Sequence, residues 1–400
     1  MHADNQPSTL AARRVAVLHN RYRTQGGEER YVGQLAELLG RRAEKFETIE
    51  SSSEQLGRTA AGAAMLRGGR LEQAKHVDSV VRKSRVDVVH AHNIHPVFGW
   101  RAVAAARSAG AAVVLHLHNY RLFCATGIAF RDGHDCTACA QRRVWNGWAR
   151  NCRGGIAEAT AYAAGIGVWQ RRLIENVDLF VSPTRQLAED LRELGFELPI
   201  EVLPTWLPDA DFADRSRCEE GGYGLFAGRL AEEKGILVAV EAAAIAGVPL
   251  RVAGDGPDLQ RARELATELA APVEFMGRLE GQALVAARLG AAYAVLPSTW
   301  REVLPFAALE AQAGGLPLIV SERGGLPELT DAKLVFSAGD ASALAERMRW
   351  LTDDSKARQA AGERALQRAR ELFSESAYVQ RLAAAYDRAV GLRAADRPSA

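Results

Sequence analysis

Two basic residues in the second half of the chain, Arg229 and Lys234, have the spacing of an anion-binding site. They lie in the run from Gly228 to Gly235, where an apolar stretch gives way to a loop and then to an expected helix. The N–H groups at a helix start attract anions, arginine can form two parallel hydrogen bonds to a phosphate, and lysine adds a compact charge. The run therefore predicts a diphosphate site, although either residue alone is more typical of a solvated surface loop.

Two carboxylates, Glu302 and Glu310, stand eight positions apart further along the chain. We expect Glu302 in a loop and Glu310 on the helix that follows, inside an apolar segment. A buried charge is costly unless it has partners, and sugar hydroxyl groups would supply them. The alternative is an exposed helical glutamate without a ligand. Gly324 and Gly325, after the next expected strand, would let a ligand approach the backbone closely.

Histidines are concentrated in the first half of the chain. Five of the nine lie between residues 90 and 118: His90, His92, His95, His116 and His118. His116 lies in an expected strand and His118 follows it at the carboxyl edge of the sheet, so we expect one of them in the core and the other facing the cleft. A zinc hydrolase is the competing hypothesis, and the missing His-Glu-x-x-His spacing argues against it.

Four of the five cysteines form the pattern Cys-x11-Cys-x2-Cys-x12-Cys: Cys124, Cys136, Cys139 and Cys152. A Cys-x2-Cys pair with two flanking thiols is typical of a four-cysteine zinc site, although the outer spacings differ from those of a standard zinc ribbon. Buried thiols without a metal are an equal alternative, and a disulfide pair is less expected in a reducing compartment. Zinc held by four thiolates would be structural, because no coordination position stays open.

The cysteine segment is also basic and aromatic. Its charged and aromatic residues are Arg121, Arg131, Arg142, Arg143, Arg150, Arg153, Asp132, Asp135, Trp145 and Trp148. An anionic membrane surface or a phosphate-bearing lipid acceptor would explain this composition, and a solvated loop is an equal alternative. The Ala-rich helical stretch over 155–174 would either dock at a membrane or pack inside the protein.

Short apolar strands and amphipathic helices must position these residues. The expected strands cover residues 15–18, 86–91, 112–117, 179–182 and 200–204, then 224–228, 250–254, 273–277, 293–296 and 317–320. Apolar runs separated by helices are typical of parallel α/β sheets. The Pro-, Asp- and Gly-rich stretch 203–222 divides the two series. We therefore predict the α/β class with two Rossmann-like doubly wound domains facing a central cleft, where ligands bind at the carboxyl edges of the strands.

Overall charge and hydropathy exclude several classes of protein. The chain has 50 Lys and Arg against 49 Asp and Glu, a net charge of +1, which excludes a histone-like binder and predicts no nucleic-acid partner. No run approaches the ~18 apolar residues of a transmembrane helix. Residues 1–10 are polar and lack the apolar core of a signal peptide. We expect a cytoplasmic protein, with peripheral contact at the inner membrane face as a further possibility.

The ordered set of motifs resembles one known family over nearly the whole chain. Gly-Arg-Leu-x-x-Glu-Lys-Gly, Glu-x7-Glu and Gly-Gly-Leu-Pro-Glu follow one another, with Gly-Asp-Gly-Pro over 254–257 between the first two. This set is similar to the retaining GT-B enzymes of glycosyltransferase family four. The resemblance implies transfer of a sugar from a nucleotide-diphosphate-sugar donor to an acceptor hydroxyl, with no metal or other cofactor needed for catalysis. A subset of these enzymes carries a Cys-rich insert after the same histidine.

The resemblance also implies roles for individual residues. Arg229 and Lys234 would hold the donor diphosphate, Glu302 the donor sugar and Glu310 the ribose. His118 is similar to the family's histidine near the donor sugar, and the N-terminal Gly-Gly loop of the family lies over the donor. The residues so assigned are His118, Arg229, Lys234 and Glu302 as catalytic, with Gly26, Gly27, Gly228, Leu304 and Glu310 as donor-binding. One departure is Pro305, which lacks an N–H group where the family often has Gly, so contacts to the donor sugar are expected to differ.

The domain assignment combines the boundary at 203–222 with the roles that the resemblance implies. We expect a disordered N-terminus over 1–12, an acceptor domain over 13–205 with the Cys-rich insert at 121–155, and a donor domain over 206–375. A C-terminal helix over 376–394 would pack back on the N-terminal domain, before a disordered tail at 395–400. The acceptor would be a saccharide or a lipid-linked molecule in envelope polysaccharide, glycolipid or glycoconjugate synthesis. A nucleotide-sugar epimerase, a phosphorylase or a non-catalytic sugar-nucleotide-binding protein are the alternatives.

Overall fold

The computed structural model describes residues 10–21, 26–54 and 56–396, and divides the chain into two compact units. Unit 1 consists of residues up to Ala129, Cys136–Leu203 and Val379 onward. Unit 2 consists of Phe130–Asp135 and Pro204–Tyr378. The chain therefore enters unit 2 briefly at Phe130–Asp135, enters it again at Pro204, and returns to unit 1 inside its last helix.

Unit 1 is built on a six-stranded sheet with the order β2-β1-β3-β4-β7-β8, in which every neighbouring pair is parallel. Its strands are β1 (Arg14–Arg21), β2 (Lys45–Ser52), β3 (Val88–Ala91), β4 (Ala112–His116), β7 (Leu179–Ser182) and β8 (Ile200–Val202). The central strands β3, β4 and β7 are buried along their whole length, because helices cover both faces of a parallel sheet. The strand order reverses between β1 and β3, which makes this pair the switch point where ligands bind in such sheets.

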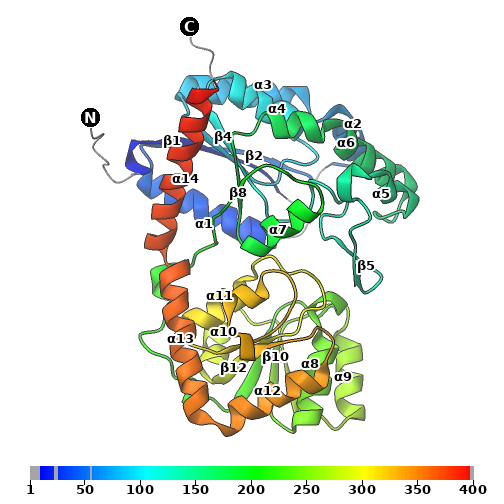
Figure 1. The fold of residues 1–400 in the computed structure, drawn as a ribbon, viewed down its shortest axis with the longest axis vertical. Helices are drawn as coiled ribbons and strands as arrows, with labels where there is room; N and C mark the ends of the chain where they lie inside the picture. Colours follow the sequence, from blue (N-terminus) through cyan, green and yellow to red (C-terminus); the bar gives the residue numbers. More distant parts are fainter. Residues whose placement is uncertain (1–9, 22–25, 55, 397–400) are drawn as a thin grey trace. The chain divides into compact units, whose positions relative to one another are not determined.

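The helices of unit 1 connect successive strands. They are η1 (Leu10–Ala12), α1 (Gly27–Arg42), α2 (Arg58–Arg67), α3 (Leu71–Ser84), α4 (Gly99–Ser108), α6 (Ile156–Glu175) and α7 (Arg185–Glu193), with α14 (Glu375–Ala395) returning at the end. Helices α3 and α4 pack side by side on one face of the sheet, and α1 lies on the other (Figure 1). Between β4 and α6 lie only η2 (Ala140–Arg142), α5 (Trp145–Ala149) and the two-residue strands β5 (Phe130–Arg131) and β6 (His134–Asp135).

Unit 2 repeats the design with the strand order β11-β10-β9-β12-β13-β14, again parallel throughout. The strands are β9 (Tyr223–Ala227), β10 (Leu250–Ala253), β11 (Val273–Gly277), β12 (Ala291–Leu296), β13 (Leu318–Ser321) and β14 (Val335–Phe336). The helices are η3 (Asp209–Asp211), η4 (Cys218–Glu220), η5 (Glu232–Lys234), α8 (Ile236–Ala246), α9 (Leu259–Glu268), α10 (Gly281–Leu289), α11 (Phe306–Ala313), η6 (Leu326–Leu329), η7 (Ala332–Leu334), α12 (Ala341–Asp353) and α13 (Ser355–Phe373). The switch point lies between β9 and β12.

Two apolar clusters hold unit 2 together, one on each face of its sheet. One cluster joins the buried sides of α8, α9 and α12, with Ile236, Ala262 and Met348 among its members. The other joins α11 and α13 to the opposite face, with Leu309 and Phe373 among its members. The predicted pair of doubly wound α/β domains is confirmed.

Three expectations about the ends and the insert need correction. Residues 1–12 are not disordered throughout, because Leu10–Ala12 form η1 and the Leu10 side chain is buried. The insert at 121–155 does not belong wholly to the first domain, because its hairpin Phe130–Asp135 belongs to unit 2. Residue 395 does not belong to a disordered tail, since α14 extends to Ala395, and residues 397–400 of the expected tail lie outside the described residues. Among the described residues, no helix is long and apolar enough to cross a membrane.

Candidate active site

The loop after β9, at the switch point of unit 2, carries the predicted anion-binding residues. Gly228 follows the strand directly, and its N–H donates to the carbonyl oxygen of Ala253. The exposed Arg229 side chain is turned along the loop, where its guanidinium forms an ion pair with Glu233. The structure therefore places Arg229 at the predicted loop but holds its charge against a carboxylate.

Lys234 ends η5, immediately before Gly235 and the first residue of α8. Its Nζ atom lies 2.5 Å from Oε1 of Glu302, a buried carboxylate in the loop after β12. Ser298 donates a hydrogen bond of 2.8 Å to the same oxygen, and the Lys234 ammonium lies 4.9 Å from the ring centre of Trp300. The structure thus brings together two residues 68 positions apart that the sequence assigned to the same donor.

The pKa of Glu302 reflects this arrangement. Burial alone would raise the pKa of the Glu302 carboxyl group. The neighbouring Lys234 ammonium and the hydrogen bonds that the carboxylate accepts hold its pKa below the ordinary value. Glu302 is therefore ionised near neutral pH. Its Oε1 is occupied by Lys234 and Ser298, which fixes the direction in which the rest of the carboxylate faces.

Close backbone contacts hold the two loops together. Gly235 adopts φ +71°, and a Cβ atom there would lie 1.9 Å from the carbonyl oxygen of Pro297. The backbone N–H of Thr299 donates to the carbonyl of Glu233 at 3.0 Å. On the other side of the carboxylate, Gly325 N–H donates to the Glu302 carbonyl at 2.7 Å. Glycine is required at 235 because both its φ and the approach of Pro297 exclude a side chain.

Two arginines flank Glu302 and share one acid. Arg301 and Arg323 each contact Oδ2 of Asp135, at 3.1 Å and 3.0 Å. Asp135 comes from the hairpin Phe130–Asp135, which belongs to unit 2. The hairpin thereby supplies a carboxylate to the loops around the candidate site.

Glu310 lies on α11, as predicted, with most of its side chain buried. Its partner is Arg288 on α10, which forms an ion pair with it. This pair explains how a carboxylate is stable in an apolar segment before any sugar binds. Leu304 is only partly buried and packs against the apolar cluster under α11, while Pro305 precedes the first residue of that helix.

In unit 1, His118 lines a cavity at the end of β4. Its Nε2 lies 3.0 Å from Nδ1 of His92, and its ring stacks on His116 with the centroids 4.1 Å apart. Burial, with a smaller effect of neighbouring histidines, lowers the pKa of His118 to about 3. The imidazole is therefore neutral near pH 7, and its contact with His92 leaves Nδ1 as the second ring nitrogen for a ligand. Glu28 and Asn119 line the same cavity.

Gly26 and Gly27 lie at the beginning of α1, a helix of 16 residues. Gly26 N–H donates to Oε2 of Glu29 at 3.0 Å, which orders the first turn. The N–H groups of such a turn favour anions. The preceding Gln25, which introduces this loop in the sequence, lies outside the described residues.

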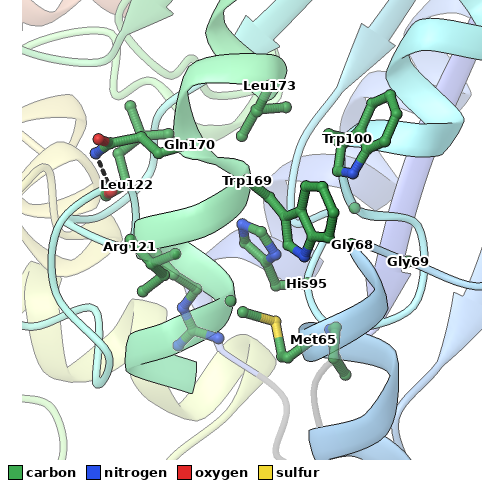
Figure 2. Close-up of a pocket in the computed structure, with 14 residues that line it drawn as sticks. Met65, Gly68, Gly69, His95, Trp100, Arg121, Leu122, Trp169, Gln170 and Leu173 are labelled. Atoms are coloured by element: carbon green, nitrogen blue, oxygen red, sulfur yellow. Dashed lines mark hydrogen bonds between the residues drawn. The ribbon is translucent and has the colours of Figure 1, made fainter. Parts of the chain in front are cut away.

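A second, narrow cavity of unit 1 adjoins the cavity at His118. The two share the lining residues His95, Arg121, Leu122 and Leu173. Figure 2 shows His95, Met65 and Trp169 around this space, and the hydrogen bond from Gln170 to the Leu122 carbonyl at its wall. The lining is mostly apolar.

All four cysteines of the predicted metal pattern line one further cavity of unit 1. Burial and the three neighbouring thiols raise the pKa of Cys139 to about 11. A different group, His90, His92 and His116, has ligand atoms within 4.8 Å of one another. His90 and His116 are hydrogen-bonded to each other and to Tyr386 and Tyr31, respectively. Both nitrogens of His90 and Nδ1 of His116 are used in these contacts, whereas Nε2 of His92 and Nε2 of His116 are buried without a hydrogen-bond partner among the described residues.

The sequence did not indicate several partners of the candidate residues. These partners are Ser298, Arg288 and Asp135, and none belongs to a motif that points to its contact. Arg288 and Asp135 lie on different elements from the residues they contact, and Ser298 contacts Glu302 within one loop whose path the sequence does not determine. His92 is one of the five histidines between residues 90 and 118, but its contact with His118 depends on the pairing of β3 with β4. Only a prediction of the parallel register between these two strands could have revealed the contact between His92 and His118.

Two domain families match the chain. The family described as Glycosyl transferase 4-like domain matches residues 26–206, and the family described as Glycosyl transferases group 1 matches residues 210–368. The candidate residues of unit 2 from Gly228 to Glu310 all lie inside the second match. Gly26, Gly27 and His118 lie inside the first.

Curated relatives match parts of the chain. Identity is 36% over 121 residues with the GDP-mannose-dependent monoacylated alpha-(1-6)-phosphatidylinositol monomannoside mannosyltransferase of Corynebacterium glutamicum, covering 28% of this chain and 32% of that protein. Identity is 29% over 261 residues with the D-inositol 3-phosphate glycosyltransferase of Corynebacterium aurimucosum, covering 57% of this chain and 61% of that protein. The matched stretches thus span less than two thirds of these relatives.

A solved structure with a similar fold is the sucrose-phosphate synthase of Thermosynechococcus elongatus. The TM-score is 0.67 at 18% identity, over 94% of this chain and 98% of that one. At this identity the similarity shows the fold, which is the GT-B arrangement of two parallel-sheet domains.

Proposed function

Since this chain is a GT-B glycosyltransferase with a glycosyl transferase 4-like domain followed by a group 1 glycosyl transferase domain, we propose that it is a retaining enzyme. It moves a sugar from a nucleotide-diphosphate-sugar donor to an acceptor hydroxyl, and the new bond keeps the anomeric configuration of the donor. The single observation that carries the proposal is the Lys234–Glu302 pair at the switch point of unit 2.

The pair supports sugar transfer because it combines a cation for the leaving group with a carboxylate for the sugar. Lys234, two residues before α8, stabilises the negative charge that develops on the diphosphate as the sugar leaves. Arg229 adds its guanidinium when it exchanges Glu233 for a phosphate oxygen. Glu302, ionised and fixed by Ser298, accepts hydrogen bonds from sugar hydroxyl groups. No carboxylate nucleophile is invoked, so the acceptor attacks from the face that the diphosphate leaves.

Glu310 completes the donor site in this proposal. Its carboxylate would accept hydrogen bonds from the two ribose hydroxyl groups, while Arg288 keeps it ionised and oriented. In unit 1, neutral His118 would contact the donor sugar, and the N–H groups after Gly26 and Gly27 would contact the phosphate.

The acceptor is proposed to be anionic and lipid-linked. An open groove in unit 1, of about 1050 Å³, is lined by Arg21, Arg67, Arg70 and Arg101. Arginine forms bidentate hydrogen bonds with phosphate, so the groove fits a phosphate-bearing acceptor. The named substrates of the two relatives, a phosphatidylinositol monomannoside and an inositol 3-phosphate, are of this chemical kind.

Contact with a membrane surface would deliver such an acceptor. Helices α2 and α5 each pack against α6, and the three helices leave large apolar side chains in solvent. They are Leu66, Trp145, Trp148, Ile156 and Val168, each at least half exposed. Arg58 and Arg171 on these helices are more than 70% exposed, and each forms an ion pair, with Glu158 and Glu175 respectively. Apolar side chains beside arginines favour the interface of an anionic membrane, the inner face of the cell membrane in this proposal.

The donor site is tested by thermal unfolding with UDP, GDP, ADP and CMP. A ligand that binds only the folded protein raises the melting temperature. We expect one diphosphate to stabilise the wild type, and Glu310→Gln to weaken that ligand about 10-fold or more, since a hydrogen bond to a charged group contributes about 1.5–3 kcal/mol. The exposed Glu268→Gln in the same unit is the control. Absence of a shift with all four nucleotides would contradict the site.

Turnover with the matching sugar nucleotide then tests the reaction. We expect release of the nucleoside diphosphate with transfer to a phosphorylated glycolipid, and nuclear magnetic resonance should show the donor's anomeric configuration in the product. Inversion would refute the retaining mechanism. Transfer to inorganic phosphate would identify a phosphorylase, and conversion without an acceptor would identify an epimerase. Donor binding without turnover would favour a non-catalytic binding protein.

A further inference from the structure

The four cysteines of unit 1 converge from separate turns onto one cavity. Cys124 follows the end of β4, Cys136 follows β6, Cys139 precedes η2, and Cys152 follows α5. The remaining lining residues are Phe123, Ala125, Ala129, Ala138, Asn146, Gly147, Arg150 and Leu194. Among these described lining residues there is no carboxylate and no imidazole. A cation in this cavity would therefore be bound by sulfur.

The segment around this cavity has little regular secondary structure. From Cys124 to Cys152 its regular elements are η2, the five-residue α5 and the two-residue strands β5 and β6. Five of its non-glycine residues have positive φ between 46° and 64°: Ala129, Asp132, Gln141, Arg142 and Asn151. Such conformations cost roughly 1–3 kcal/mol each and persist only where other interactions fix the backbone. A cross-link among the cysteines would provide that restraint.

We propose that Cys124, Cys136, Cys139 and Cys152 bind one Zn²⁺ in a closed structural site. Cys136 and Cys139 are separated by two residues in a turn closed by the hydrogen bond from Ala140 N–H to the Thr137 carbonyl. That arrangement gives two ligands to one ion, and a set of four sulfur ligands selects zinc among common divalent cations. Cys124 and Cys152 supply the third and fourth positions from the two ends of the segment.

Zinc binding requires the four cysteine sulfurs to move closer together. Among the described residues, His90, His92 and His116 have ligand atoms within 4.8 Å of one another, whereas no three of the four cysteine sulfurs lie that close together. The sulfurs of a zinc site lie closer than that, at Zn–S distances of about 2.3 Å. Short irregular turns can shift to close this gap more easily than the buried strands that carry His90 and His116. We therefore assign the metal to the cysteines.

The test is metal analysis of the whole chain purified with a reductant and without chelator. We expect about one zinc per chain, since a closed site binds one ion. Cys136→Ser and Cys139→Ser should each lose most of the zinc. Cys218→Ser is the matched control, because Cys218 is a buried thiol of unit 2 hydrogen-bonded to Ser216, far along the chain from the insert. This control should keep its zinc.

A second measurement protects the test against variants that fail to fold. X-ray absorption on the wild type should show four sulfur neighbours at about 2.3 Å from zinc. Chelation should remove the metal, expose the four thiols to a thiol reagent and speed proteolysis between residues 124 and 152. Donor binding in unit 2 is read separately, so a failure of the donor site leaves this result intact. Wild-type protein without zinc, a mass lower by the hydrogens of a disulfide, or nitrogen and oxygen neighbours around the metal would overturn the proposal.

Discussion

At the level of single residues, Lys234 and Glu302 depend on each other. Glu302 is buried, and its pKa stays low because Lys234 and the hydrogen bond from Ser298 outweigh the effect of burial. Breaking a buried ion pair by removing one partner leaves an uncompensated charge, whereas replacing both partners by neutral groups removes the cost. The stability of the loop and its role in transfer can therefore be separated by mutation.

Lys234→Met should lower the free energy of unfolding by about 3 kcal/mol at neutral pH, since this is the typical cost of an unpaired buried charge. The double variant Lys234→Met/Glu302→Gln should recover most of that loss. Both variants should transfer sugar about 100-fold more slowly, because the leaving diphosphate loses its cation. Urea unfolding and diphosphate release measure the two effects.

Measuring the same variants at lower pH provides a control for this prediction. Without Lys234, burial raises the pKa of Glu302, so protonation removes the buried charge. The loss in free energy of unfolding caused by Lys234→Met should therefore shrink as pH falls. The exposed Lys356→Met on α13 should behave as the wild type. A double variant as unstable as the single one would contradict the pairing, and normal transfer by Lys234→Met would contradict the catalytic role.

The sequence could predict Arg229, Lys234, Glu302 and Glu310 because each lies at a fixed position relative to a strand or a helix. It could not predict the ion pair between Arg288 and Glu310, since that contact depends on how α10 and α11 pack. The pairing of Arg229 with Glu233 was also missed, although the two residues are four positions apart. Glu233 and Glu310 both lie in motifs that indicated a ligand site. In the structure, Glu233 is paired with Arg229 and Glu310 is paired with Arg288.

At the level of elements, burial decided which strands the sequence revealed. Strands β3, β4 and β7 are buried throughout and appear as continuous apolar runs. Strand β2 is at the edge of its sheet, and Ile49 is its one fully buried residue, so it lacks such a run and was missed. Helices α2 and α3 were missed with it, because the expected series began again only at β3.

The junction between η5 and α8 positions Lys234, and Gly235 is the residue that permits it. Gly235→Ala should destabilise unit 2 in two ways. A left-handed conformation costs a non-glycine residue about 1–2 kcal/mol, and the new Cβ would clash with the Pro297 carbonyl. Because that clash separates the loops of Lys234 and Glu302, nucleoside diphosphate affinity should also fall. Urea unfolding and calorimetric titration measure stability and affinity.

Gly247 is the matched control at the other end of the same helix. It has φ +67°, but a Cβ there would meet no atom within 4 Å. Gly247→Ala should therefore cost only the conformational term of about 1 kcal/mol and leave nucleotide affinity unchanged. Equal effects of the two substitutions would show that the contact with Pro297 does not position the site.

At the level of the whole molecule, the division into two doubly wound units followed from the two series of strands. The hairpin Phe130–Asp135 was placed in the wrong unit, because chain order assigns it to the insert while the contacts of Asp135 assign it to unit 2. The return of the chain through α14 is fixed in unit 1 by side chains such as Tyr386, whose hydroxyl lies 3.0 Å from Nδ1 of His90. Unit 1 thereby gathers a core unusually rich in neutral histidine.

This core should make unit 1 sensitive to mild acid. Burial lowers the pKa of His19 to about 4 and the pKa values of His90, His95 and His118 to about 3. The unfolded chain takes up these protons near pH 6.5 and the folded chain does not, so stability falls as pH drops below that value, by up to about 1.4 kcal/mol per pH unit for each histidine. Urea unfolding between pH 7 and 5 measures how the free energy of unfolding changes with pH. His95→Asn should reduce this slope by the equivalent of about one bound proton. The exposed His76→Asn is the control for the substitution itself. Loss of stability that begins only below pH 4.5 would instead assign the acid sensitivity to carboxylates such as Glu302, whose stabilising contribution disappears in that lower range.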